Sequence, residues 1–333
     1  MKLILISLLV FIFNFLIFNK FKKLAFYFSF MDRPDHKLKN HDHPVSLSGG
    51  LILLMNLYLI IFVLKIFNLD NFIFNDRFIY PFFIMSTFFY LIGFIDDVKN
   101  LTPGLKLLLI CVSSGVVFYF FPELKLVIIK ISFLDKIYYF NSFALFFLIM
   151  CFALLSNALN MFDGINLQLI LFSFFVFIVF ILKGFFIFFY FLIMISLIFL
   201  GLLNYKNKLF LGDGGSYLIS SIIGLSFIYQ YKYYENFLYA DEIFIILLIP
   251  SLDMFRLFCV RLINKKNPFK GDLNHFHHII KRYYKNNHYT LLISTLSFIL
   301  PSILLIFQIK TYYILIVSVI FYTLTITSLK KKI

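Results

Sequence analysis

The sequence predicts an all-α polytopic membrane protein, and three observations support this fold class. Hydrophobic residues make up 62% of the 333 residues and charged residues only 14%. The mean hydropathy is +0.95. Globular proteins contain roughly 45–50% apolar and about 25% charged residues, so no soluble core accounts for this composition. The third observation is that the apolar residues are gathered into runs long enough to cross a bilayer.

About eleven apolar runs fit the length of a transmembrane helix, which needs roughly 17–25 residues to cross the hydrocarbon core. They lie at 3–19, 47–67, 78–95, 105–121, 143–159, 167–182, 184–203, 215–230, 242–263, 290–308 and 311–328. The runs at 167–182 and 184–203 meet at Lys183 and Gly184, so we expect a tight helical hairpin there. Residues 122–142 carry two short alternating stretches and are expected to form a small hairpin outside the membrane. We expect a single domain over residues 1–333.

The distribution of positive charge predicts which way these helices face. The chain has 30 Lys and Arg against 16 Asp and Glu, a net charge of +14. Cytoplasmic loops are enriched in Lys and Arg, and most of these residues fall on the cytoplasmic side if the N-terminus is outside and the C-terminus is cytoplasmic. Charge sorting across a bilayer therefore explains the excess better than a nucleic-acid partner does. The five loops with clustered acidic residues, asparagines, glycines or histidines all fall on the cytoplasmic side in this orientation.

The first cytoplasmic loop ends in a glycine pair, Gly49 and Gly50, where the second apolar run begins. It also contains Asp32, Lys39 and His41. A simple basic anchor has no need of this mixture of histidines, prolines and glycines. Because glycine at a helix start lets a phosphate approach the backbone amides, we expect an anion near this pair.

The second cytoplasmic loop begins with two adjacent carboxylates, Asp96 and Asp97. Ionised side chains at the mouth of a membrane helix are costly to dehydrate. Two of them would be redundant as a helix cap. A hard divalent cation or a cationic substrate explains the pair better.

The third loop carries Asn157, Asn160, Asp163 and Asn166 at intervals of three residues, with Gly164 among them. This spacing places the four side chains broadly on one helical face. In apolar surroundings such a polar stripe predicts the lining of a cleft. The alternative is hydrogen bonding between helices, which Asn also forms in membranes.

The fourth loop runs through Phe210 and a Gly-Asp-Gly-Gly-Ser segment at 212–216 directly into an apolar run. We expect bare backbone amides at this helix N-terminus, with Asp213 placed to hold a cation. Amides and a cation both attract negative charge, so the combination suits a metal-bound pyrophosphate.

The fifth loop carries three histidines, His275, His277 and His278. Zinc is one interpretation, but no thiolate accompanies them. The acidic clusters of the other loops offer oxygen ligands, which favour magnesium. Phosphate-binding or acid–base histidines are therefore the preferred interpretation.

Taken together, these motifs resemble the polyprenyl-phosphate N-acetylhexosamine-1-phosphate transferases, a glycosyltransferase-4-like family of bacterial membrane enzymes. The sequence is more similar to the branch that initiates O-antigen, common-antigen and teichoic-acid linkage chains, because its histidine motif reads HxHH. The resemblance covers about residues 31–280. It rests on five ordered motifs: Asp32 to Gly49-Gly50, Asp96-Asp97, residues 157–164, residues 210–216 and residues 268–278.

The resemblance implies a role for each matching residue. It implies that Asp213 and Asn160 hold Mg²⁺, with Mn²⁺ as an alternative, and that Phe210 stacks on uracil. Asn166 and Asp163 are implied to lie at the uridine. The residues implied to surround the reacting phosphates are Asp96, Asp97, Lys39, Lys106 and the three histidines. The implied catalytic residues are Asp96, Asp97, His275, His277 and His278, and the implied substrate-binding residues are Lys39, Lys106, Asp163, Asn166, Asn204 and Phe210. The sequence departs from the family pattern at Asn100, where relatives often carry Asp or Lys, and at Leu167, where many relatives carry glycine.

The implied reaction transfers HexNAc-1-phosphate from a UDP-sugar to polyprenyl phosphate, releasing UMP at a cytoplasmic-face active-site cleft. The implied partners are the UDP-sugar, the polyprenyl phosphate lipid and the bilayer, without nucleic acid. The product would initiate a cell-surface glycan such as lipopolysaccharide at the bacterial cytoplasmic membrane. The alternative is a transporter or lipid flippase with a cytoplasmic polar cleft. Transporters usually contain matching internal repeats, and the sequence shows none.

Overall fold

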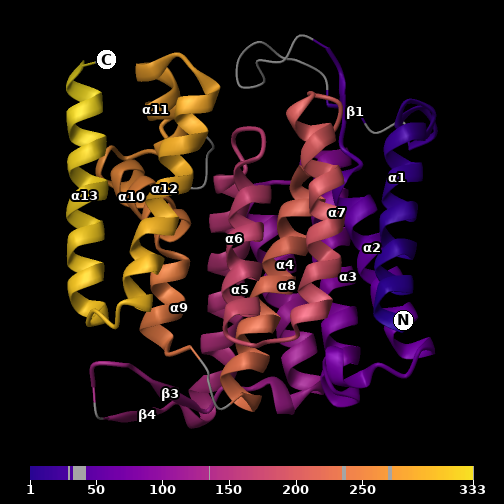
Figure 1. Cartoon of the computed structure of the whole chain (residues 1–333). Helices are drawn as coiled ribbons and strands as arrows, with labels where there is room; N and C mark the ends of the chain where they lie inside the picture. Colours follow the sequence, from indigo (N-terminus) through magenta and orange to yellow (C-terminus); the bar gives the residue numbers. More distant parts are fainter. Residues whose placement is uncertain (29–30, 33–42, 135, 235–237, 269–271, 333) are drawn as a thin grey trace.

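The computed structural model describes residues 1–28, 31–32, 43–134, 136–234, 238–268 and 272–332. It is a bundle of long helices with two short β-hairpins (Figure 1). The helices of the first half are α1 (Lys2–Phe28), α2 (Gly49–Ile66), α3 (Asp76–Lys99), α4 (Pro103–Phe120), α5 (Ala144–Phe162) and α6 (Gln168–Leu182). Those of the second half are α7 (Ile187–Tyr205), α8 (Gly212–Tyr233), α9 (Ala240–Ile246), α10 (Leu248–Ile263), α11 (Phe276–Tyr284), α12 (Asn287–Ile306) and α13 (Thr311–Lys332). Three single turns of 3₁₀-helix lie at Asp70–Phe72, Pro122–Leu124 and Asn141–Phe143.

Each predicted apolar run lies in helix, and the all-α polytopic fold class is confirmed. Within the described residues, eight helices are long and apolar enough to cross a membrane, and α9 with α10 adds a ninth if the pair counts as one span. α6 is shorter, at 15 residues. α8 differs in character, because every residue from Gly214 to Gln230 is buried by other helices. A helix surrounded by protein can carry the small and polar residues that α8 contains.

The predicted run at 242–263 is not one straight helix. It is broken at Leu247 into α9 and α10, whose axes differ by 78°. Pro250 lies in the first turn of α10. Proline has no N–H to bond the carbonyl four residues earlier and clashes with it, so a helix cannot run straight from Ile246 through Pro250.

The two hairpins lie at opposite ends of the bundle. β1 (Met31–Asp32) and β2 (Val45–Ser46) are antiparallel, with Met31 opposite Ser46. β3 (Ile128–Lys130) and β4 (Ile137–Tyr139) form the hairpin predicted within 122–142, with Ile128 opposite Tyr139. Figure 1 shows β1, α11 and the C-terminus at one end, and the N-terminus with the β3–β4 hairpin at the other.

The core of the bundle forms around α8, which packs against α2, α3, α5 and α6. The N-terminus of α8 therefore lies in the middle of the end that carries β1 and α11. The predicted motif loops gather around it.

The orientation in the membrane is open to a labelling test. We expect the end with β1 and α11 to be cytoplasmic, because most Lys and Arg lie there. Lys99→Cys, at the end of α3, should be spared by a membrane-impermeant thiol reagent in intact cells. Lys136→Cys, beside β4, should be labelled. The unsubstituted protein, whose three cysteines are partly buried, is the control. Labelling of Lys99→Cys by the impermeant reagent would overturn the orientation.

Candidate active site

A cavity of about 1260 Å³ opens at the end of the bundle where the motif loops meet. Most of the predicted site residues line it, although they come from four different segments of the sequence. Those that line it are Asp96, Asp97, Lys106, Asn160, Asp163, Asn166, Asn204, Phe210, Asp213 and His278. Lys39 lies outside the described residues. Asn157 instead donates a hydrogen bond to the carbonyl of Ala153 within its own helix, at 2.8 Å.

Glycines allow the start of α8 to lie directly against α2 and α3. A Cβ atom at Gly93 of α3 would be 2.3 Å from the carbonyl oxygen of Asp213, and one at Gly50 of α2 would be 2.5 Å from the amide nitrogen of Gly215. Both distances are far below van der Waals contact, so backbone meets backbone at these two points. This close approach brings Asp213 to the side chains of α3, α4 and α5.

The glycine pair Gly49-Gly50 does not serve the phosphate for which it was predicted. The amide of Gly49 donates to the carbonyl of Phe210 at 3.1 Å, and that of Gly50 donates to the carbonyl of Leu211 at 3.0 Å. The prediction of an anion at these amides is therefore wrong. The pair instead joins the start of α2 to the loop before α8, which fixes the backbone of Phe210 at the cavity.

The amides at the start of α8 are not bare either. The carboxylate of Asp97 accepts hydrogen bonds from the amides of Asp213, at 2.9 Å, and Gly214, at 3.1 Å. Helix N-termini leave such donors unsatisfied, and a carboxylate there also interacts favourably with the helix dipole. Asp97 thus caps α8 from α3, where the sequence predicted that the amides would face an anionic ligand.

Asp213, Asp96, Lys106 and Asn160 form a charged centre at one wall of the cavity. Asn160 donates to one carboxylate oxygen of Asp213 at 2.7 Å, and the Lys106 ammonium contacts the other at 3.2 Å. Lys106 also pairs with Asp96, whose second oxygen accepts from the amide of Leu101 at 2.7 Å. Asp96 is only 3% exposed, so it depends on these partners for its charge.

This charged centre suits a hard cation in its chemistry. Two carboxylates and an amide side chain offer oxygen atoms, which magnesium prefers. Lys106 already places one positive charge between Asp96 and Asp213. No group of three or more His, Cys, Asp or Glu side chains in the described part of the chain is close enough to enclose a metal by itself.

The turn after α5 forms a second wall. Burial, together with the nearby charge of Asp213, raises the pKa of Asp163 to about 7. Asn166 donates to the carbonyl of Asn204 at 3.0 Å and to the side chain of Asn207 at 2.6 Å. Asn204 in turn accepts from the amide of Leu167 at 2.6 Å. Asn204 therefore fastens this turn to the end of α7.

The two departures from the family pattern both fall at residues with positive φ. Leu167 has a φ of 69°, where glycine fits without strain, and leucine there costs about 1–2 kcal/mol. The hydrogen bond from its amide to Asn204 offsets part of this cost. Asn100 ends α3 with a φ of 49°, a conformation that Asn tolerates well.

The structure separates the three predicted histidines. His278 lines the cavity, and burial, with the charges of His275 and Lys281, lowers its pKa to about 4. His278 is therefore a neutral hydrogen-bonding group near pH 7. His277 is fully buried behind Gly164, and burial lowers its pKa well below the usual value. His275 is buried against Asp253 at 2.9 Å. Neither is among the described residues that line the cavity.

Several basic residues that sequence reasoning missed complete the cavity wall. Lys281 and Arg282 follow His278 by three and four residues, so they lie on the same face of α11. That helical spacing was a usable signal. The others come from the loop after α7 and from the start of α12: Lys206, Lys208 and His288.

The chain is similar to known proteins in two comparisons. Residues 79–231 match a family described as Glycosyl transferase family 4. The chain is 28% identical over 288 residues to a protein of Thermotoga maritima named undecaprenyl-phosphate alpha-N-acetylglucosaminyl 1-phosphate transferase. The match covers 86% of this chain and 84% of that protein.

The glycine contact between α3 and α8 can be tested with a matched pair of variants. Gly93→Ala should displace the start of α8, because its methyl group would overlap the backbone of Asp213 and Gly214. Overpacking of this kind typically costs about 1–3 kcal/mol, so we expect a lower Tm in detergent. Gly104→Ala is the control, since nothing lies within 4 Å of its Cβ position. Equal Tm values for the two variants would contradict the proposed close contact.

Proposed function

The chain belongs to glycosyl transferase family 4, and on that premise we propose that it is a membrane phospho-sugar transferase. It moves N-acetylhexosamine 1-phosphate from a UDP-sugar to polyprenyl phosphate and releases UMP. The observation that carries this proposal is one cavity in which the carboxylates of Asp96, Asp97, Asp163 and Asp213 line the same space as basic side chains, at one end of a membrane helix bundle. The relative's name, which specifies an undecaprenyl-phosphate acceptor, supports the same chemistry.

The basic residues that line the cavity, which we call the basic wall, counter the first obstacle of this reaction. That obstacle is the repulsion between the two anionic substrates, the UDP-sugar and the polyprenyl phosphate. Lys206, Lys208, Lys281 and Arg282 provide positive charge around the cavity. Phosphoryl transfer depends largely on positioning and on charge stabilisation of this kind. His278, being neutral near pH 7, would donate or accept a hydrogen bond at a phosphate oxygen rather than act as a fixed cation.

The charged centre of Asp213, Asp96, Lys106 and Asn160 forms what we call the carboxylate wall of the cavity. This wall fits a divalent cation, which we propose is magnesium. Asp213 and Asn160 would hold it, with Asp96 beside them. When bound, it would neutralise charge on the pyrophosphate and stabilise the developing charge on the leaving phosphate. Lys106 lies between Asp96 and Asp213 and contacts both. With the cation bound, it would pair with the carboxylate that contacts the cation less.

Asp163 is suited to moving a proton. A carboxyl group with a pKa of about 7 exchanges protons readily at cytoplasmic pH. A phosphate monoester has a second pKa near 6, so about one tenth of the polyprenyl phosphate carries a proton at pH 7. Asp163 would accept that proton as the phosphate becomes the nucleophile. Phe210, fixed by its backbone, would offer its ring to the uracil base.

The location of the cavity suits the two substrates. A nucleotide sugar reaches it from the aqueous phase, whereas a polyprenyl tail stays among the apolar faces of the helices. We therefore propose that the reaction takes place at the cytoplasmic face of the bacterial inner membrane. Its product would begin a cell-surface glycan such as lipopolysaccharide.

The direct test is release of UMP by the purified chain. UDP-N-acetylhexosamine, polyprenyl phosphate and Mg²⁺ together should give UMP and a lipid-linked pyrophosphoryl sugar, and omission of any one should stop release. A panel of UDP-sugars would then identify the donor. Lipid-independent hydrolysis of the UDP-sugar, or no release with any donor, would exclude the proposal.

The charge of Asp213 is expected to be essential. Asp213→Asn should lower turnover by about 10² or more, the usual effect of losing one preorganised electrostatic group. Asp70→Asn is the matched control, since Asp70 is 60% exposed and pairs with Lys65 on the surface. Its activity should be unchanged, because exposed ion pairs contribute little. Near-normal Mg²⁺-dependent turnover in Asp213→Asn would show that the metal assignment is wrong.

We also expect one direct displacement without a covalent aspartyl-phosphate. The mostly dianionic phosphate is already a nucleophile, and the contacts of Asp96 and Asp97 are taken by Lys106 and by backbone amides. Labelled UMP should therefore not exchange into UDP-sugar in preparations free of polyprenyl phosphate. Exchange at catalytic rates would make one of the aspartates a nucleophile.

A further inference from the structure

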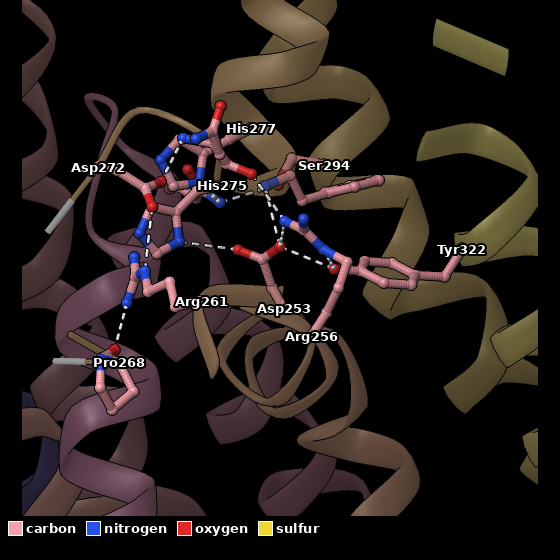
Figure 2. A network of polar contacts seen from close by, with 12 residues as sticks. Asp253, Arg256, Arg261, Pro268, Asp272, His275, His277, Ser294 and Tyr322 are labelled. Atoms are coloured by element: carbon pink, nitrogen blue, oxygen red, sulfur yellow. Dashed lines mark hydrogen bonds and ion pairs between the residues drawn. The ribbon is translucent and has the colours of Figure 1, made fainter. Parts of the chain in front are cut away.

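A buried network of polar side chains links α10, α11 and α13 behind the cavity, and Asp253 is its centre (Figure 2). One oxygen of Asp253 accepts from Arg256 at 2.7 Å and from the hydroxyl of Tyr322 at 2.7 Å. The other contacts the Nδ1 atom of His275 at 2.9 Å. Asp253 is 3% exposed. A buried carboxylate is very costly without partners, so this network defines one arrangement of the three helices.

Asp253 also caps the start of α11. His275 precedes the helix in an extended conformation, and its side chain makes no capping hydrogen bond within the described structure. The amide of Phe276 instead donates to Asp253 at 3.0 Å. A carboxylate at a helix N-terminus satisfies an otherwise unpaired donor and interacts favourably with the helix dipole. The cap of α11 thus comes from another helix.

The segment leading into α11 is held by two arginines of α10. Arg256 donates to the carbonyl of Asn274 at 2.7 Å. Arg261 contacts Asp272 at 3.0 Å and the carbonyl of Pro268 at 2.7 Å. Asp272 accepts in turn from the amide of Asn274 at 2.7 Å. These contacts fix where α11 begins and in which direction it leaves.

α11 matters to the site because it carries three of the cavity groups. His278, Lys281 and Arg282 all lie within two turns of its capped start and line the cavity. A rotation or shift of this nine-residue helix would move all three together. The position of this part of the basic wall therefore depends on contacts made outside the cavity.

The C-terminal helix α13 takes part through Tyr322. Its hydroxyl donates to Asp253 and accepts from the Nε atom of Arg256 at 2.9 Å, and its ring packs on Phe276 with centroids 5.3 Å apart. Tyr322 is 3% exposed, whereas neighbouring Phe321 and Leu324 are more than half exposed. A helix that served only as a membrane anchor would not need a buried hydroxyl.

We propose that Asp253 and Tyr322 are positioning residues of the transferase, which hold α11 so that its cationic groups meet the anionic donor. This proposal rests on the proposed function for its choice of ligand. It also gives α13 a defined role. None of the described residues of α13 lines the cavity, yet Tyr322 helps to set the geometry of the groups that do. The competing explanation is that the network only stabilises the fold.

Tyr322→Phe is the sharpest test, because it removes one hydroxyl and keeps the ring on Phe276. We expect KM for the UDP-sugar to rise about tenfold, as for loss of one hydrogen bond to a charged group, with a smaller change in kcat. Hydrogen exchange of the α11 amides should become faster, while α8 exchanges as before. Tyr313→Phe, an exposed tyrosine of the same helix, is the control and should change neither quantity.

Asp253→Asn provides the second variant, since it removes the charge with little change of volume. It should raise KM further than Tyr322→Phe and speed exchange at Phe276 most. Unchanged KM and unchanged α11 exchange in Tyr322→Phe would overturn the proposal. So would a lower Tm with exchange accelerated throughout the bundle, which indicates a purely structural role.

Failure of the proposed function would be distinguishable from failure of this inference. If the unsubstituted chain released no UMP, the transferase proposal would fall, and with it the choice of ligand. Exchange in full-length protein in detergent would still decide whether Asp253 and Tyr322 hold α11. Faster exchange confined to α11 supports the positioning role, and unchanged exchange excludes it.

Discussion

The direct contact between the N-terminus of α8 and the backbones of α2 and α3 is the constraint on which the rest of the site depends. It exists because Gly50 and Gly93 have no Cβ atoms to separate the helices. α8 is buried along most of its length, so its start cannot shift without disturbing the core. Through this contact Asp213 reaches Asn160 and Lys106, which come from α5 and α4.

The same structure shows how a membrane protein keeps carboxylates at its helix ends. Asp97 and Asp253 each cap a helix other than their own, α8 and α11 respectively. Both capped helices present charged or polar groups to the cavity. Caps supplied from neighbouring helices therefore fix the relative positions of the carboxylate wall and the basic wall. Reactive groups on two separate helices need such a fixed relation, because catalysis by positioning is sensitive to small displacements.

The sequence predicted many of the residues that form the candidate site, but it did not predict which contacts each of them makes. Most of the aspartates and asparagines predicted from the second, third and fourth loops do meet in one cavity with Phe210 and His278: Asp96, Asp97, Asn160, Asp163, Asn166 and Asp213. The glycine motifs were assigned to phosphate binding, whereas the amides of Gly49 and Gly50 bond the carbonyls of Phe210 and Leu211. His275 shares the histidine motif with His278 but faces Asp253. A motif identifies residues that lie close in sequence, and it does not say which way each side chain points.

The sequence by itself determined the fold class, because runs of apolar residues as long as a bilayer is thick admit only transmembrane helices. It also determined the chemistry available at one end of the bundle, since polar residues between such runs must lie at its ends. The tertiary structure alone decided the partners: the cap that Asp97 places on α8, and the link from Tyr322 through Asp253 to α11. These contacts join residues from about 23 to 117 positions apart. Local composition carries no record of contacts over such separations, because they are set by how whole helices pack.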